Sequence, residues 1–265
     1  MKGKGIKTLA FLLSLAGVGM LIYPAVSDFV NRLSGTYAIQ SLQNQTARTD
    51  PDDLQSEYSR ALDYNYRLLH RPSEITDTEY LQILDFQDGM MGYITIEKIN
   101  VMLPIYHGVS ETVLSKGVGH LPSSGLPVGG QGNHAVLTGH TGLPSAELFT
   151  ELTELEVGDV FYITVLGEVL TYKVDQIKVV LPEQTQDLMP VAGADLCTLI
   201  TCTPYGINSH RLLVRGRRAP LHQPSESILP TQKENPPLGM ILCTVILLCG
   251  YIATIILLLF QKIRY

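Results

Sequence analysis

A cysteine and an arginine flank a short loop late in the chain. Residues 197–202 form a β-rich run that ends on Cys202, and residues 211–215 form a second run that opens on Arg211. The segment between them contains Pro, Gly, Asn and Ser, which are typical of a turn or loop. This strand–loop–strand pattern places a thiol and a guanidinium near one rim. It suits a thiolate nucleophile with a fixed cation aimed at developing negative charge, although a cysteine ending an apolar strand can also be a core residue.

A cysteine nucleophile also needs a proton-transfer partner. His140 is the best candidate because the short apolar strand 135–139 ends on it, at a rim where Cys202 also lies, but spacing alone leaves a structural role open. The pattern favours surface or turn roles for His120 and His134, and an exposed role for His210. The remaining histidines are His70, His107 and His222.

Two arginines could supply the cation. Arg211 follows the loop directly, so it lies nearest the strand end that carries Cys202. Arg215 is four residues further along and reads as a structural or surface charge. Arginine stays charged and offers five donors in a fixed fork, which suits an oxyanion or an extended substrate backbone.

Composition excludes several other functions. The chain has 265 residues and a formal net charge of -6, which argues against a nucleic-acid partner. The sequence contains no phosphate-loop motif and no C-x-x-C pair, so neither a nucleotide site nor a zinc or redox motif is supported. Cys197 and Cys202 lie on one predicted strand, where about 16 Å would separate their Cα atoms, so no disulfide is expected.

Both ends of the chain resemble membrane segments. Lys2, Lys4 and Lys7 precede an uncharged run over residues 8–27, which is either an anchor or a cleaved signal segment. A second uncharged run, 238–260, would reach about 34 Å as a helix, enough to cross the hydrocarbon core. Basic residues also follow that run, so we expect both charged flanks in the cytoplasm and residues 28–237 outside it.

Between these ends the pattern predicts helices first and strands later. Residues 28–48 read as a stalk, and a helix capped by Asp50 is predicted from Pro51 to about His70. A capping box at 76–79 opens a second helix that stops near Gly89. The remaining predicted elements are strands at 93–99, 101–106, 135–139, 160–166, 169–180, 197–202 and 211–215, a turn-rich connection at 117–133 and a helical spacing at 144–155. Many short strands with small helices indicate a closed or nearly closed all-β barrel.

Several segments together resemble the sortase family. Residues 198–202 read Thr-Leu-Ile-Thr-Cys, which has the Thr-Leu-x-Thr-Cys form of sortases, and Arg211 follows at the spacing of the sortase arginine. Residues 137–140 read Leu-Thr-Gly-His and resemble the sortase histidine segment. Further segments are similar to class C, the pilin-polymerising sortases: 96–108, 117–120, 142–146 and 203–216. The resemblance covers roughly residues 50 to 219, and a membrane helix at each end also fits that class.

The resemblance implies an eight-stranded sortase β-barrel with Cys202, His140 and Arg211 lining one groove. By this analogy Cys202 attacks the Thr–Gly bond of a Leu-Pro-x-Thr-Gly-like sorting signal, His140 transfers protons and Arg211 holds the substrate and oxyanion. A lysine of the next pilin then resolves the thioacyl enzyme, so pilin subunits and the membrane are the implied partners. No cofactor or metal is implied. The implied location is the outer face of the cell membrane of a Gram-positive bacterium, with the C-terminus in the cytoplasm.

The chain departs from class C in one respect. Those sortases usually carry a lid with an Asp-Pro-aromatic tripeptide, and residues 70–91 contain none. The Asp50-Pro51 pair is followed by another aspartate and reads as a helix start. We therefore expect a groove that is open in the resting state, with residues 50–88 packed on the barrel.

The expected organisation has six segments. They are an N-terminal anchor or signal at 1–27, a stalk and helical region at 28–91, the barrel at 92–219, a Pro-rich linker at 220–237, a membrane helix at 238–260 and a tail at 261–265. Two other functions remain open: a housekeeping-type sortase with a peptidoglycan precursor as acceptor, and a non-catalytic exported binding module in which Cys202 is a core residue. The C-terminal span and the class C flanks weigh against the first.

Overall fold

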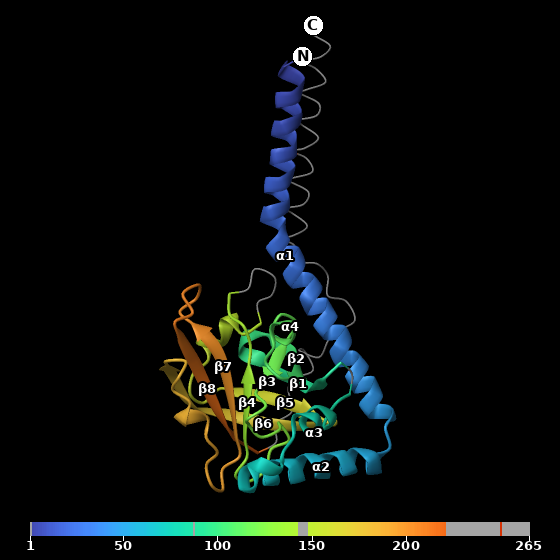
Figure 1. Cartoon of the computed structure of the whole chain (residues 1–265), viewed down its shortest axis with the longest axis vertical. Coiled ribbons are helices and arrows are strands. Elements are labelled where there is room, and N and C mark those ends of the chain that lie inside the picture. The colour runs from blue at the N-terminus through green and yellow to red at the C-terminus, as the bar shows by residue number, and fades with distance from the viewer. Residues whose placement is uncertain (1, 87, 143–147, 221–249, 251–265) are drawn as a thin grey trace.

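The computed structural model shows a closed eight-stranded β-barrel that is preceded in the chain by three α-helices (Figure 1). The structure describes residues 2–86, 88–142, 148–220 and 250, with side chains in the first helix from Leu12 onward. The strand order around the barrel is β1-β2-β3-β4-β7-β8-β6-β5. The strands are β1 (Met90–Ile96), β2 (Val101–His107), β3 (Val118–His120), β4 (His134–Thr138), β5 (Val160–Val165), β6 (Glu168–Val180), β7 (Leu196–Thr203) and β8 (His210–Arg218).

The barrel confirms the all-β prediction and brings distant segments together. Parallel pairing places β4 beside β7, although nearly sixty residues separate them, and antiparallel pairing places β7 beside β8. Alternate residues of β7 point inward, where Cys197 and Leu199 join the buried core of the barrel. Of the intervening residues, which face the outer side, Ile200 and Cys202 are partly exposed and Thr198 is buried.

The first helix, α1 (Lys2–Arg48), corrects the prediction of a weakly patterned stalk over 28–48. Its C-terminal half is helical and packs on the barrel, with Ile39 and Leu42 buried against Tyr93 and Tyr106. Its N-terminal half projects away from the barrel (Figure 1). This helix is long and apolar enough to cross a membrane, and its most apolar 18 residues are not buried against the rest of the described protein.

The helix α2 (Pro51–His70) begins as predicted, with the Asp50 side chain accepting a hydrogen bond from the Asp52 amide. The helix α3 (Asp77–Gln82) begins at the predicted capping box but ends well before Gly89, so its predicted extent is wrong. The chain leaves the helix there because Ile83 and Leu84 enter the core, and Glu57 accepts a hydrogen bond from the Leu84 amide at 2.7 Å.

Two other predictions are corrected. The turn-rich connection contains the short strand β3, and the segment expected to be helical near 150 is a 3-10 turn (Thr150–Glu154). The surface roles expected for His120 and His134 are wrong, because both rings are buried. Apart from Gly250, the predicted second membrane run, 238–260, lies outside the described residues, and so does the linker 220–237 beyond Pro220.

The buried histidine ring of β3 is held in its neutral form. His120 Nε2 donates to the Gly125 carbonyl at 2.9 Å, and Nδ1 accepts from the Tyr80 hydroxyl at 3.0 Å. Burial, which disfavours the charged ring, lowers the pKa of His120 from 6.5 to about 4.

This burial makes part of the folding stability depend on pH. Because the unfolded chain binds the His120 proton more readily, the free energy of unfolding should fall as pH drops from about 6.5 toward 4, by up to about 3 kcal/mol from this residue. Urea unfolding of the detergent-solubilised chain at several pH values measures it. A His120→Asn variant should be less stable but should lose this part of the pH dependence. An unchanged pH dependence in the variant would assign the effect to other groups.

Candidate active site

Three neighbouring strands carry the three predicted site residues to one rim of the barrel. Cys202 in β7 pairs directly with Arg211 in β8. In the parallel pair of β4 and β7, Thr138 lies opposite Ile200, so extending the register by two residues sets His140 beside Cys202. Residues in register on adjacent strands project from the same face of a sheet. The structure therefore pairs Cys202 with Arg211 and brings the chain just after β4, which carries His140, to the same rim.

Hydrogen bonds hold the histidine loop against β7. The Gly139 amide donates to the Ile200 carbonyl at 3.0 Å, and the Thr201 hydroxyl donates to the Gly139 carbonyl at 2.8 Å. A side chain at Gly139 would meet the Phe149 ring at 2.8 Å, so this close approach requires glycine. Thr201, which precedes Cys202, therefore anchors Gly139, which precedes His140.

The two described cysteines, both free thiols, have opposite environments. Cys197 is fully buried in the barrel core, where burial and the nearby Asp195 carboxylate raise the pKa of its thiol well above the usual value. Cys202 lies at the end of the same strand and is partly exposed. Because the thiolate is the nucleophilic form, Cys197 is the inert thiol and Cys202 is the candidate nucleophile.

The candidate arginines also differ in their partners. Arg215 makes a bidentate ion pair with Asp175, with Nε–Oδ1 and Nη2–Oδ2 distances of 2.9 and 3.1 Å. Arg211 donates through Nη1 to the carbonyls of Asn208 and His210 at 3.1 and 3.0 Å. Among the ion pairs of the described residues none includes Arg211. Its charge is therefore not neutralised by a carboxylate, unlike that of Arg215.

A residue that the sequence did not point to contacts the histidine. His140 Nε2 lies 3.3 Å from the Oε2 atom of Glu111. Glu111 begins the short helix α4 (Glu111–Leu114), and nothing in the spacing along the chain links it to His140. The carboxylate can orient the ring by accepting a hydrogen bond from Nε2.

We expect this contact to have a modest effect on turnover, since the Glu111 side chain is 77% exposed. Glu111→Gln keeps the shape and removes the charge, so kcat for peptide-bond transfer should fall about two- to fivefold. Steady-state kinetics with a sorting peptide measures it. Glu154→Gln, at another exposed glutamate, is the matched control and should leave kcat unchanged. An equal change in both variants would mean that Glu111 has no specific role at His140.

The outer face that carries Cys202 continues along β7 and β4. The connection between β6 and β7 covers this surface at its far end. Next to Cys202 the partly exposed Ile200 and Thr138 lie side by side on β7 and β4. One step further, Thr198 is buried and donates to His134 Nε2 at 2.7 Å, while His134 Nδ1 donates to the Met189 carbonyl at 3.0 Å. The covered end is therefore made by the connection between β6 and β7.

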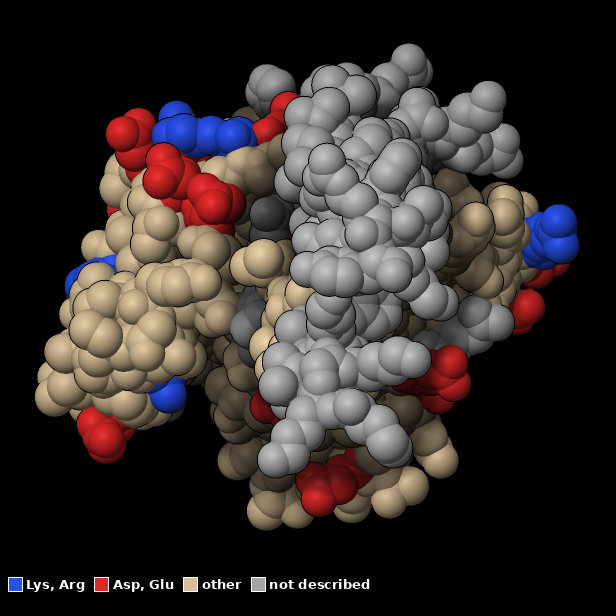
Figure 2. Space-filling view, turned by 90° about the horizontal axis from the view of Figure 1, so that it is seen from above, with Lys and Arg blue, Asp and Glu red and all other residues tan. Residues whose placement is uncertain are grey.

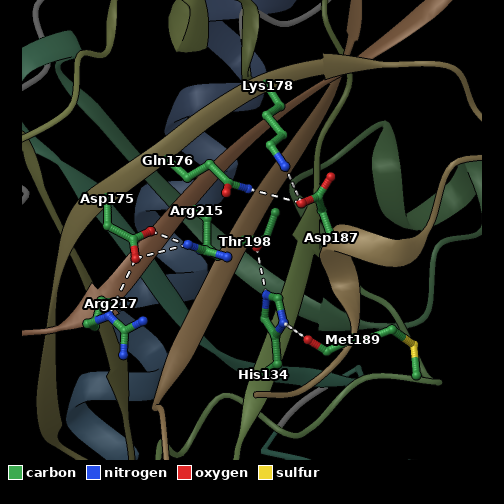
Figure 3. A network of polar contacts seen from close by, with 9 residues as sticks. All are labelled: His134, Asp175, Gln176, Lys178, Asp187, Met189, Thr198, Arg215 and Arg217. Atoms are coloured by element: carbon green, nitrogen blue, oxygen red, sulfur yellow. Dashed lines mark hydrogen bonds and ion pairs between the residues drawn. The ribbon is translucent and has the colours of Figure 1, made fainter. Parts of the chain in front are cut away.

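Charged pairs fasten that connection to the sheet (Figure 3). Lys178 Nζ lies 2.6 Å from Asp187 Oδ1, and Gln176 donates to the same atom at 3.3 Å. Asp175 holds both Arg215 and Arg217 on the neighbouring strand. The surface beside Cys202 thus runs between neighbouring strands toward a fixed end, which suits an extended peptide chain.

The region from α3 to β1 packs on β2 and β3 of the barrel. His107 contacts the carbonyls of Ile83 and Gly89 at 2.8 and 2.9 Å, and Tyr80 contacts His120. Within the described ranges no group of three or more His, Cys, Asp or Glu side chains could hold a metal ion.

Comparison with known proteins gives one consistent result. Residues 94–219 match the sortase domain. Sortase C1 from Streptococcus agalactiae is 44% identical with a TM-score of 0.67, over 70% of this chain and 100% of that chain. Sortase C from Clostridium perfringens, solved with the C-terminal cell wall sorting motif, is 41% identical with a TM-score of 0.63, over 70% of this chain and 99% of that one.

A curated relative extends the comparison. Sortase A from Streptococcus agalactiae serotype III is 33% identical over 117 residues, which are 43% of this chain and 47% of that protein. The matches span about half the length of the curated relatives, with 47%, 59% and 41% covered in the three proteins.

Proposed function

Because the chain belongs to the sortase family, with class C sortases among its structural relatives, we propose that it is a membrane-anchored cysteine transpeptidase that joins pilin subunits. The observation that carries the proposal is the pairing of Cys202 with Arg211 across β7 and β8, at the rim that the chain after β4 reaches with His140. A nucleophile, a proton-transfer group and an unneutralised cation at one rim are the parts that acyl transfer requires. The apolar half of α1 supports the membrane anchor.

In the proposed reaction the Cys202 thiolate attacks the threonine carbonyl carbon of a Leu-Pro-x-Thr-Gly-like signal. Arg211 stabilises the negative charge that develops on the carbonyl oxygen. The C–N bond to glycine breaks, His140 gives its proton to the leaving amine, and a thioester forms on Cys202. A lysine amine then attacks the thioester, His140 takes its proton, and the thiolate leaves as the isopeptide bond forms. Electrons and protons balance without a cofactor.

Two features support an extended peptide as the substrate. The partly exposed surface at Ile200 and Thr138 leads away from Cys202 toward the fastened β6–β7 connection. A similar protein, the sortase C of Clostridium perfringens, has been solved with the C-terminal cell wall sorting motif. The pilin acceptor is proposed from the class C relatives, and a peptidoglycan precursor is the alternative acceptor, since sortase A proteins are also similar.

Incubation with candidate pilins separates the two acceptors. The full chain in detergent is mixed with pilins encoded near it, and covalent ladders are sought on denaturing gels. Ladders that disappear with Cys202→Ala are the expected result. Monomers from every pilin, together with transfer of a sorting peptide to a peptidoglycan-like amine, would instead support the housekeeping alternative.

We also propose that the groove is open in the resting protein. The segment 70–91 has no Asp-Pro-aromatic tripeptide, and its contacts with His107 and His120 hold it on β2 and β3. A plug would lower apparent affinity by the closed fraction. Phe86 is a large, partly buried side chain of this segment. Alkylation of Cys202 should therefore proceed at the same rate, within about twofold, when Phe86 is replaced by alanine. A large increase in rate would reveal a covering segment.

A further inference from the structure

The packing of α1 sets how far the barrel lies from the membrane. The uncharged run of the chain ends at Ser27, and one turn later Asn31 donates to the Ser115 carbonyl at 3.5 Å. At the rise of an α-helix, about 6 Å separates these two positions along the axis. The headgroup region on each side of a bilayer is about 5–7 Å thick. With residues 8–27 across the hydrocarbon, Ser115 lies at the level of the headgroups.

Ser115 belongs to the catalytic end of the barrel. It directly follows α4, whose Glu111 contacts His140. The apolar half of α1 projects beyond this end, and the β7–β8 turn reaches further in the same direction than α4 does, whereas α2 crosses the opposite end (Figure 1). The rim with Cys202 therefore lies at the end of the barrel from which the apolar half of α1 projects.

The β7–β8 turn, residues 204–209, presents two apolar side chains at this end. Tyr205 is 68% exposed and Ile207 is 72% exposed. The Tyr205 ring also lies beside the histidine loop, since a side chain at Gly142 would meet it at 2.9 Å. Viewed from this end, the described surface is mostly uncharged, and the charged side chains gather toward its edges (Figure 2). Single exposed apolar residues are ordinary, but these two lie together on the turn at the end from which the apolar half of α1 projects.

We infer that the β7–β8 turn places Tyr205 and Ile207 in the headgroup region of the bilayer that α1 crosses. Tyrosine is favoured there because its ring enters apolar surroundings while its hydroxyl stays hydrated. The inference rests on the proposed membrane anchor. The turn connects the strand of Cys202 to the strand of Arg211, so this contact holds the mouth of the site at the surface from which a membrane-tethered substrate emerges.

The chain contains no tryptophan, so a single introduced indole reports its own surroundings. We would place the full chain with Tyr205→Trp in phosphatidylcholine–phosphatidylglycerol vesicles, with and without lipids brominated near the headgroup. Tyr66→Trp is the matched control, because Tyr66 is a similarly exposed tyrosine on α2 at the opposite end. Bromine should reduce the emission of the Tyr205→Trp protein at least about twofold and leave that of Tyr66→Trp nearly unchanged.

Ile207→Trp is a second reporter on the same turn, and its emission should be quenched in the same way. It keeps the test valid if Tyr205→Trp disturbs the local fold. Equal quenching of the turn reporters and the α2 reporter, or none in either turn reporter, would overturn the inference. Quenching requires no turnover, so this outcome is distinct from failure of the transpeptidase proposal, which the pilin ladders test separately.

Discussion

Cys202→Ala should reduce transpeptidation at least about 10⁴-fold, to below detection, because no other described thiol can form the acyl intermediate. The substitution removes one sulfur atom from a partly exposed strand end, so it should leave the folded barrel intact. Release of the glycine fragment from a sorting peptide, measured by chromatography, gives the rate. Urea unfolding checks that stability is preserved.

Cys197→Ala is the matched control for this experiment. Cys197 lies on the same strand but points into the core, so its replacement should lower stability by roughly 1–2 kcal/mol while turnover continues. Turnover by Cys202→Ala, or its loss in a folded Cys197→Ala protein, would contradict the assignment of the nucleophile.

Arg211→Ala should lower kcat/KM about 10²- to 10³-fold, the usual effect of removing one oxyanion donor. Arg211→Lys keeps the charge but loses the planar fork, so we expect it to recover only part of the rate. We expect this large effect because Arg211 pairs with Cys202 across β7 and β8. Its guanidinium also has no carboxylate partner among the described ion pairs. Steady-state kinetics with a sorting peptide measures each variant.

Arg215→Lys serves as the comparison, since Arg215 is bound bidentately by Asp175 on the adjacent strand. It should affect stability more than turnover. Near-normal turnover of Arg211→Ala would remove Arg211 from the site and leave Arg215 or backbone donors to stabilise the oxyanion.

Local pattern was sufficient for much of the fold and for naming Cys202, His140 and Arg211 as candidates, and their roles stay a prediction. The caps of α2 and α3 follow from Asp50 and Thr76, whose side chains accept the first helical amides. The strand that leads to His140 and the strand that carries Cys202 could be identified because each apolar run stops at a polar or turn-forming segment. Parallel pairing of β4 with β7 then explains why residues so far apart in the chain reach one rim.

Long-range contacts were not predictable in this way. His120 looked like a loop residue because the Tyr80 hydroxyl and the Gly125 carbonyl that satisfy its ring come from segments with no visible link to it. Glu111 was missed as a partner of His140 for the same reason. The helix from 28 to 48 was missed because only Ile39, Leu42 and a few neighbours are buried, which gives a weak pattern.

Mass spectrometry of the trapped acyl enzyme tests the central claim most directly. The full chain is incubated with a Leu-Pro-x-Thr-Gly peptide without an amine acceptor, quenched in acid and digested. We predict a mass increase equal to the peptide up to its threonine, located on the fragment that contains Cys202 and removed by hydroxylamine. An acyl group on another residue, or none while glycine is still released, would contradict the account.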